Sequence, residues 1–125
     1  MTFKPALIIQ RGSGCHTKPK FEDTSSLTIY ANESGTLKPG ANYICQSGFS
    51  VKIPDGWVGL LQPKTQLAFK GIAVLAQTLP SSWHGEFKIQ LINGSDKEVE
   101  IRAGDPVIKL TVVPCIACNH AVFNW

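Results

Sequence analysis

Short apolar stretches that alternate with polar residues recur along the chain and are separated by glycine and proline. The clearest is Glu86–Ile92, where Phe87, Ile89 and Leu91 alternate with charged or amide side chains. A repeat of two residues is typical of a strand with one buried face. Further strands are predicted at Ala6–Gln10, Leu27–Ala31, Val51–Ile53, Trp57–Gln62, Gly71–Ala76, Val99–Ile101 and Val107–Val113.

Turn signals such as Pro54–Gly56 and Asn93–Ser95 interrupt the chain about every eight to twelve residues, as in sandwiches and barrels. No long stretch keeps an apolar stripe at helical spacing, so at most one or two turns of helix are predicted, at Thr65–Lys70. Gly71–Ala76 is continuously apolar, which predicts burial on both faces. The sequence therefore predicts an all-β fold, a jelly-roll-type double-sheet barrel, in a single domain spanning residues 1–125.

Composition narrows the classes of function. The chain has 125 residues, 43% hydrophobic and 17% charged, and its longest apolar run falls far short of the roughly 20 residues that cross a bilayer. The start does not resemble a signal peptide, so no membrane association and a cytoplasmic location are expected, or a host-intracellular one for a viral protein. The net charge of +3 tolerates a phosphate-bearing ligand, but no basic stripe predicts nucleic-acid binding.

The cysteines offer one candidate metal motif. Cys115 and Cys118 form a C-x-x-C with His120 nearby, and Cys15 with His16 could complete a tetrahedral zinc site. A lone C-x-x-C is weak evidence, because a zinc site normally shows a second pair of ligands at its own spacing. Structural cysteines are the favoured interpretation, and no metal or cofactor is predicted.

The chain also carries several ordered motifs. Residues 53–72, IPDGWVGLLQPKTQLAFKGI, resemble the dUTPase pattern IP-x-G-x-x-G-x-I-x-PRSGLA-x-K-GI without a gap. Residues 83–89 are similar to the pattern YRGEI-x-V, residues 91–93 to L-x-N, residues 101–107 to I-x-x-GDRI, and residues 25–31 stand where the family carries AGYDLYA. On these motifs the chain is identified as a member of the dUTPase superfamily, which includes dCTP deaminase.

The resemblance implies an arrangement as well as a fold. Members of the family are homotrimers of jelly-roll-like subunits with active sites between subunits. A β-hairpin holds the uracil, and magnesium helps to bind the triphosphate. A homotrimer and a nucleotide ligand are therefore expected for this chain.

The acidic residues of the family's reactions are replaced. The position of the water-activating aspartate falls at Pro80, and the second acidic position of that motif is Ser82. Proline has no ionisable group, so it cannot activate water. The metal-associated aspartate of the first motif falls at Thr28, and the proton-shuttling glutamate of the deaminases falls at Gln90. No catalytic residue is assigned, and dUTP diphosphatase activity is not expected.

A ligand site is predicted at Lys64, Thr65, Gln66, Ser82 and Trp83. Lys64 and Thr65 keep a cation and a hydroxyl where the family binds phosphate, and the indole of Trp83 stands where the family has its gating aromatic. Two alternatives remain open: the first three residues form a capped helical turn on the surface, or Trp83 is an anchoring core aromatic.

Two hypotheses about function follow. In the first, the chain is a pseudoenzyme of viral or phage type that acts by binding a protein partner or a nucleotide. In the second, it is a nucleotide-handling enzyme of the superfamily with a remodelled site. A scaffold built from the trimer is a third option. The apolar tail after Pro114 lacks the family's glycine-rich closing motif, and is expected to form an extra strand or to dock on a neighbour.

Overall fold

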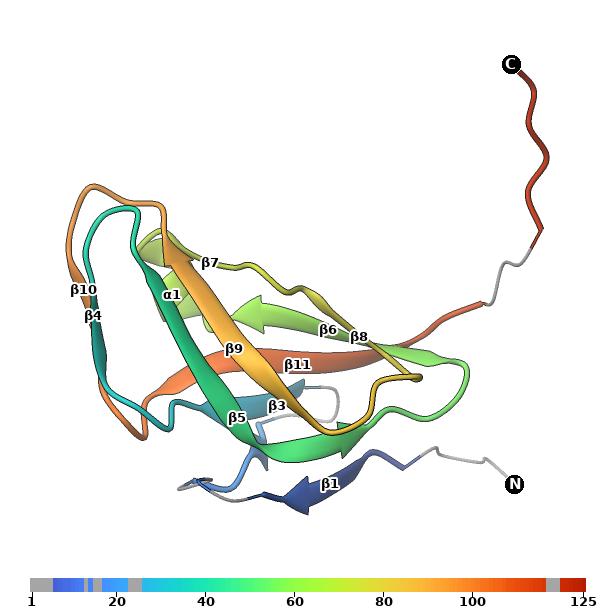
Figure 1. The fold of residues 1–125 in the computed structure, drawn as a ribbon, viewed down its shortest axis with the longest axis horizontal. Helices are drawn as coiled ribbons and strands as arrows, with labels where there is room; N and C mark the ends of the chain where they lie inside the picture. Colours follow the sequence, from blue (N-terminus) through green and yellow to red (C-terminus); the bar gives the residue numbers. More distant parts are fainter. Residues whose placement is uncertain (1–5, 13, 15–16, 23–25, 117–119) are drawn as a thin grey trace.

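Two antiparallel sheets pack face to face in the computed structural model, which describes residues 6–12, 14, 17–22, 26–116 and 120–125 (Figure 1). The helix α1 and the strands are, in chain order, β1 (Ile8–Arg11), β2 (Lys20–Phe21), β3 (Ser26–Tyr30), β4 (Gly35–Leu37), β5 (Asn42–Lys52), β6 (Trp57–Pro63), α1 (Thr65–Phe69), β7 (Ile72–Val74), β8 (Thr78–Pro80), β9 (Glu86–Asn93), β10 (Val99–Ile101) and β11 (Pro106–Pro114).

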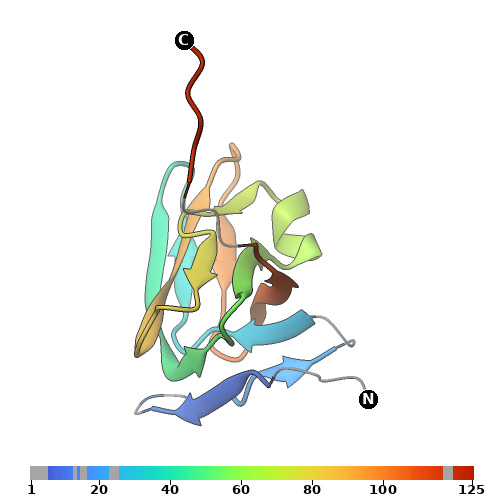
Figure 2. The same ribbon diagram turned by 90° about the vertical axis from the view of Figure 1, so that its right-hand side faces the viewer.

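Neighbouring strands in each sheet are mostly distant from one another in the sequence. One sheet runs β1-β5-β9-β7, the other runs β2-β3-β11-β6-β8, and β4 pairs with β10 in a small ribbon at one end. Figure 2 shows the sheets edge-on, with β1 and β2 along one side of the body. This double-sheet arrangement confirms the predicted all-β, jelly-roll-type fold.

The core lies between the sheets because each strand turns one set of alternate side chains inward. On β9 the residues Phe87, Ile89 and Leu91 are buried, whereas Glu86 and Lys88 face outward, as the period of two predicts. Phe49 of β5 meets Phe87 edge to face, with ring centroids 5.5 Å apart. These contacts join β5 and β9 into the centre of their sheet.

Most predicted elements are confirmed, with three kinds of difference. The predicted helical turn is α1, and strands occur in each of the predicted ranges. The range 71–76 contains β7, but Ala73 is exposed, so the predicted burial on both faces is wrong. The first part of β5 and the short strands β2, β4 and β8 were not predicted.

The strands β8 and β9 are consecutive in the chain but belong to different sheets. β8 pairs with β6, whereas β9 pairs with β5 and β7. The connection between them therefore spans the two layers at one end of the body (Figure 1). The candidate site lies at this connection between β8 and β9.

The C-terminal residues 120–125 extend away from the body (Figures 1 and 2). They contain no strand, and neither do residues 115–116, so the predicted extra strand does not occur in the part of the tail that the structure describes. Val122, Phe123 and Trp125 are exposed. Among the described residues, no helix has the length and apolar character needed to span a membrane.

Candidate functional site

A tight turn between β8 and β9 carries Trp83. The backbone N–H of Trp83 donates to the carbonyl of Pro80 at 3.0 Å, which closes the turn. The indole Nε1–H donates to the carbonyl of Gly85 at 3.0 Å, and Gly85 has φ +91°. Because 38% of Trp83 is exposed, the alternative of an anchoring core aromatic is not supported.

A hollow of about 400 Å³ opens beside Trp83, between β8 and β9, and we call it the inner hollow. Its volume lies in the range of small-molecule sites. In the described chain, β7 pairs with residues 91–93 of β9 only. On that side of β9, the backbone of residues 86–88 therefore pairs with no described strand. The lining residues are Gln46, Leu61, Ala76, Thr78, Leu79, Trp83, Glu86, Phe87 and Lys88.

A smaller hollow of about 160 Å³, the outer hollow, also involves Trp83. Lys52 lines it and donates a hydrogen bond from its ammonium to the carbonyl of Ser81, which fastens the turn to β5. The outer hollow is lined by Ile8, Gln10, Ser50, Val51, Lys52, Trp83, His84 and Gly85. Trp83 thus lines both hollows, and Lys52 holds the segment that carries it.

The second group of predicted residues lies where β6 ends and α1 begins. Thr65 and Gln66 are exposed, and Lys64 precedes the helix without capping it through its side chain. The Lys64 ammonium donates to Glu22 Oε2 at 2.8 Å and to Thr28 Oγ1 at 3.3 Å. The helical turn of this alternative is present on the surface, but no side chain caps it, and the Lys64 ammonium bonds to Glu22 and Thr28 instead.

The two predicted groups lie at opposite ends of β6. Pro80 of β8 is opposite Val58, near the start of β6, and Lys64 follows its last residue. Six residues of extended chain span about 20 Å. Within one chain, the structure brings Ser82 close to Trp83 and keeps both far from Lys64.

Two carboxylates near these groups were not identified from the sequence. Glu22, which directly follows β2, reaches Lys64, and Glu86 lines the inner hollow. The backbone of Gly12 makes room for Glu86, since a Cβ at residue 12 would collide with Glu86 Oε1. Comparing motifs misses Glu22 and Glu86 because it considers only the positions at which the family carries its acidic residues.

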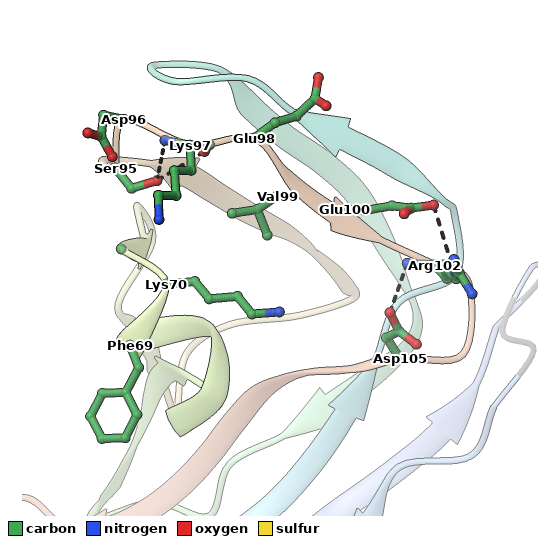
Figure 3. Close-up of a pocket in the computed structure, with 11 residues that line it drawn as sticks. Phe69, Lys70, Ser95, Asp96, Lys97, Glu98, Val99, Glu100, Arg102 and Asp105 are labelled. Atoms are coloured by element: carbon green, nitrogen blue, oxygen red, sulfur yellow. Dashed lines mark hydrogen bonds and ion pairs between the residues drawn. The ribbon is translucent and has the colours of Figure 1, made fainter.

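A wider charged groove of about 870 Å³ lies at the other end of the body, and none of the predicted site residues lines it (Figure 3). Its side chains carry both signs of charge, and Arg102 Nε donates to Glu100 Oε1 at 3.4 Å. The groove is lined by Phe69, Lys70, Gly71, Ser95, Asp96, Lys97, Glu98, Val99, Glu100, Arg102 and Asp105.

The candidate zinc motif lies partly outside the described residues. Cys15, His16 and Cys118 belong to the part of the chain that is not described, and Cys115 is exposed with a free thiol. Within the described residues, no group of three or more His, Cys, Asp and Glu side chains is placed to hold a metal ion.

Glu22 and Thr28 do not fit a protein-held magnesium ion. Glu22 Oε2 and Thr28 Oγ1 are both engaged by the ammonium of Lys64. We therefore derive no step through a metal ion held by these two residues.

A protein-family model described as dUTPase matches residues 16–124. The chain belongs to the dUTPase family. The predicted superfamily is thus confirmed, and the match covers both groups of candidate site residues.

Curated relatives carry the name deoxyuridine 5'-triphosphate nucleotidohydrolase. The protein from Wolbachia pipientis wMel is 35% identical over 73% of this chain, and the match spans only 63% of that relative's length. A protein from Rhizobium rhizogenes is 33% identical over 88% of this chain and 67% of its own. One from Hydrogenobaculum is 32% identical over 78% of each chain.

Solved structures support the same fold. A variant of the dUTPase of Staphylococcus bacteriophage 80alpha is 17% identical, with a TM-score of 0.84 over 98% of both chains. A variant of the phage phi11 dUTPase is 19% identical, with a TM-score of 0.82 over 97% of this chain and 98% of its own.

The hypothesis of a non-enzymatic protein is wrong. Curated dUTP nucleotidohydrolases at 28–35% identity favour an enzyme instead. The physical error was to infer the loss of activity from Pro80, Ser82 and Thr28 alone. Carboxylates occur at other positions, since Glu22 pairs with Lys64 and Glu86 lines the inner hollow.

Proposed function

We propose that this protein is a nucleotide-handling enzyme of the dUTPase family with a remodelled site, and that its ligand is a pyrimidine nucleoside triphosphate. The observation that carries the proposal is the inner hollow between β8 and β9, beside the exposed indole of Trp83. An aromatic face at the rim of an apolar hollow suits a planar base.

The backbone supplies recognition in this proposal. β8 is an edge strand, and residues 86–88 of β9 have one edge that β7 does not cover. Backbone N–H and C=O groups at such edges can pair with the alternating donors and acceptors of a pyrimidine. Trp83 lines the hollow and is assigned to the base, and Ser82, the residue before it on the turn, is assigned to the sugar.

The phosphates are assigned to Lys64, Thr65 and Gln66. Because these residues lie about 20 Å along β6 from the Trp83 turn, we propose that a site combines them with the Trp83 turn of another copy. A homotrimer, as the family resemblance implies, brings such surfaces together. The proposal includes no protein partner.

The first test measures turnover. The protein is incubated with dUTP, dCTP, dTTP and UTP as magnesium complexes, and released pyrophosphate and deaminated base are quantified. Turnover of at least one pyrimidine nucleotide is expected, with Lys64→Met and Trp83→Ala both strongly reduced. If the wild-type protein turns over none of the four, the proposed enzyme is wrong.

The second test asks whether the site is shared between copies. Lys64→Met and Trp83→Ala chains are unfolded together, refolded in equal amounts and assayed. A shared site takes each residue from a different chain, so random mixing restores about one quarter of the wild-type activity. A site within one chain stays inactive, because every chain carries one defect.

A further inference from the structure

Two further lysines, Lys20 and Lys109, lie on the strands beside the ion pair between Glu22 and Lys64. Thr28 of β3 is directly opposite Lys20 of β2 on one side and Lys109 of β11 on the other. Residues directly opposite each other in antiparallel strands share a face, with about 5 Å between neighbouring strands. Lys20, Lys109 and the Lys64 ammonium therefore surround Thr28.

Among the described residues, Glu22 forms an ion pair with Lys64 of this group of lysines. Its backbone N–H donates to the carbonyl of Ser26 at 3.2 Å, so the pairing of β2 with β3 continues to Glu22. The side chain of Glu22 is 51% exposed, whereas that of Lys64 is only 17% exposed. Glu22 is thus the more exposed half of the pair.

Lys64 has supports that do not depend on Glu22. Its backbone N–H donates to the carbonyl of Val107 at 3.0 Å, and its ammonium also donates to the hydroxyl of Thr28, which is fully buried. The ammonium therefore keeps its direction when Glu22 leaves. A carboxylate beside three lysines mainly opposes an anion, because like charges repel at short range.

We propose that Glu22 is the internal counter-ion of a polyphosphate site centred on Thr28, and that a bound polyphosphate chain takes its place on Lys64. The inference rests on the proposed function and adds a residue that limits affinity for the phosphate chain. Exposed ion pairs are weak, so a polyanion that also meets Lys20 and Lys109 can separate Glu22 from Lys64.

The test uses inorganic tripolyphosphate, which has no base and needs no turnover. Binding to the full chain is measured by isothermal titration calorimetry in low salt, without added metal. The Glu22→Gln variant is expected to bind about tenfold more tightly than the wild type, because a close negative charge is removed. The gain should shrink in high salt, where exposed charges are screened.

A matched control separates this local effect from a change in net charge. Glu100 pairs with Arg102 at 3.4 Å on the surface, so Glu100→Gln also removes one charge from an ion pair. This control should stay within about twofold of the wild type, because it lacks the lysines around Thr28. Lys64→Met should abolish the tight binding in the Glu22→Gln background.

Three results would overturn the inference. They are equal or weaker binding by Glu22→Gln, an equal gain by Glu100→Gln, and no tripolyphosphate binding by any of these proteins. Each can be read independently of nucleotide turnover. Nucleotide turnover without tighter binding by Glu22→Gln would support the proposed function and contradict the role of Glu22. Tighter binding by Glu22→Gln without nucleotide turnover would support the role of Glu22 and contradict the proposed function.

Discussion

The two ends of β9 differ in how their polar groups are held, and we assign one end to stability and the other to ligand recognition. At its last residue, Asn93 is fully buried and its amide donates to the carbonyls of Leu37 and Lys97, at 2.9 and 2.7 Å. Its Oδ1 accepts hydrogen bonds from the backbone N–H and hydroxyl of Ser95, at 2.9 and 2.6 Å. Every polar atom of that amide has a partner.

The turn before the first residue of β9 is exposed, in contrast to the buried Asn93 at the other end of the strand. Ser82, Trp83 and His84 are exposed, and the turn is fastened by a few bonds, among them Lys52 to Ser81. Buried polar networks with all partners present fix a conformation, whereas exposed polar and aromatic groups are available to a ligand. The difference separates residues that hold the fold from residues that we assign to recognition.

The largest expected effect breaks the buried end. Asn93→Ala should lower the free energy of unfolding by about 3 kcal/mol, because the carbonyls of Leu37 and Lys97 are left without their donor. Urea unfolding followed by circular dichroism measures this. Asn42→Ala, an exposed position on β5, is the control and should change stability by less than about 0.5 kcal/mol. Equal losses of stability for the two variants would contradict the special role of Asn93 in holding the fold.

At the exposed end, the expected effect is on binding. Trp83→Ala should weaken nucleotide binding by about 1 to 3 kcal/mol, the usual contribution of stacking a base on an aromatic ring. Its free energy of unfolding should change by less than about 1 kcal/mol, since Trp83 is outside the core. Calorimetric titration and urea unfolding of the same sample provide both numbers. A large loss of stability with unchanged affinity would assign Trp83 to the fold.

The smallest expected effect is a pH dependence at the buried end. Burial raises the pKa of Tyr43, whose hydroxyl donates to the carbonyl of Glu33 at 2.6 Å. The unfolded chain loses this proton near pH 10, before the folded chain does, so stability should fall as the pH rises above about 10. The fall due to one proton has a limit of about 1.4 kcal/mol per pH unit.

The variant Tyr43→Phe isolates that contribution. It should reduce the slope of stability against pH above about pH 10, because phenylalanine does not titrate and the lysines are the same in both proteins. Urea midpoints between about pH 9 and pH 11 provide the slope. Identical slopes for the two proteins would show that Tyr43 does not contribute.

The sequence predicted the strands whose apolar residues alternate cleanly, such as Glu86–Ile92. It missed the first part of β5, where Ser47 and Gly48 interrupt the apolar positions although both are buried. Gly48 has φ +79° at the irregular part of the β5–β9 ladder. It also missed β8, which is three residues long and ends in Pro80. Short strands depend on a neighbour more than on their own pattern.

For the site, motif spacing found the position of Trp83 in the chain but gave neither its exposure nor the hollows beside it. Glu22 was not identified because it lies outside the matching motif, yet strand pairing carries it to Lys64, which is 42 residues away in the chain. Contacts between strands distant in sequence cannot be read from local patterns. The five site residues stay a prediction until ligand binding is measured.

Gly12 has a consequence for how relatives of this chain can vary. A Cβ there would meet the carboxylate of Glu86 and lie 2.9 Å from the carbonyl of Gly48. The Glu86 carboxylate ends a flexible side chain and can move aside, whereas the backbone carbonyl of Gly48 cannot. Replacing Gly12 is therefore expected to disturb its backbone hydrogen bond to Gly48, and relatives should keep glycine here whatever side chain they carry at residue 86.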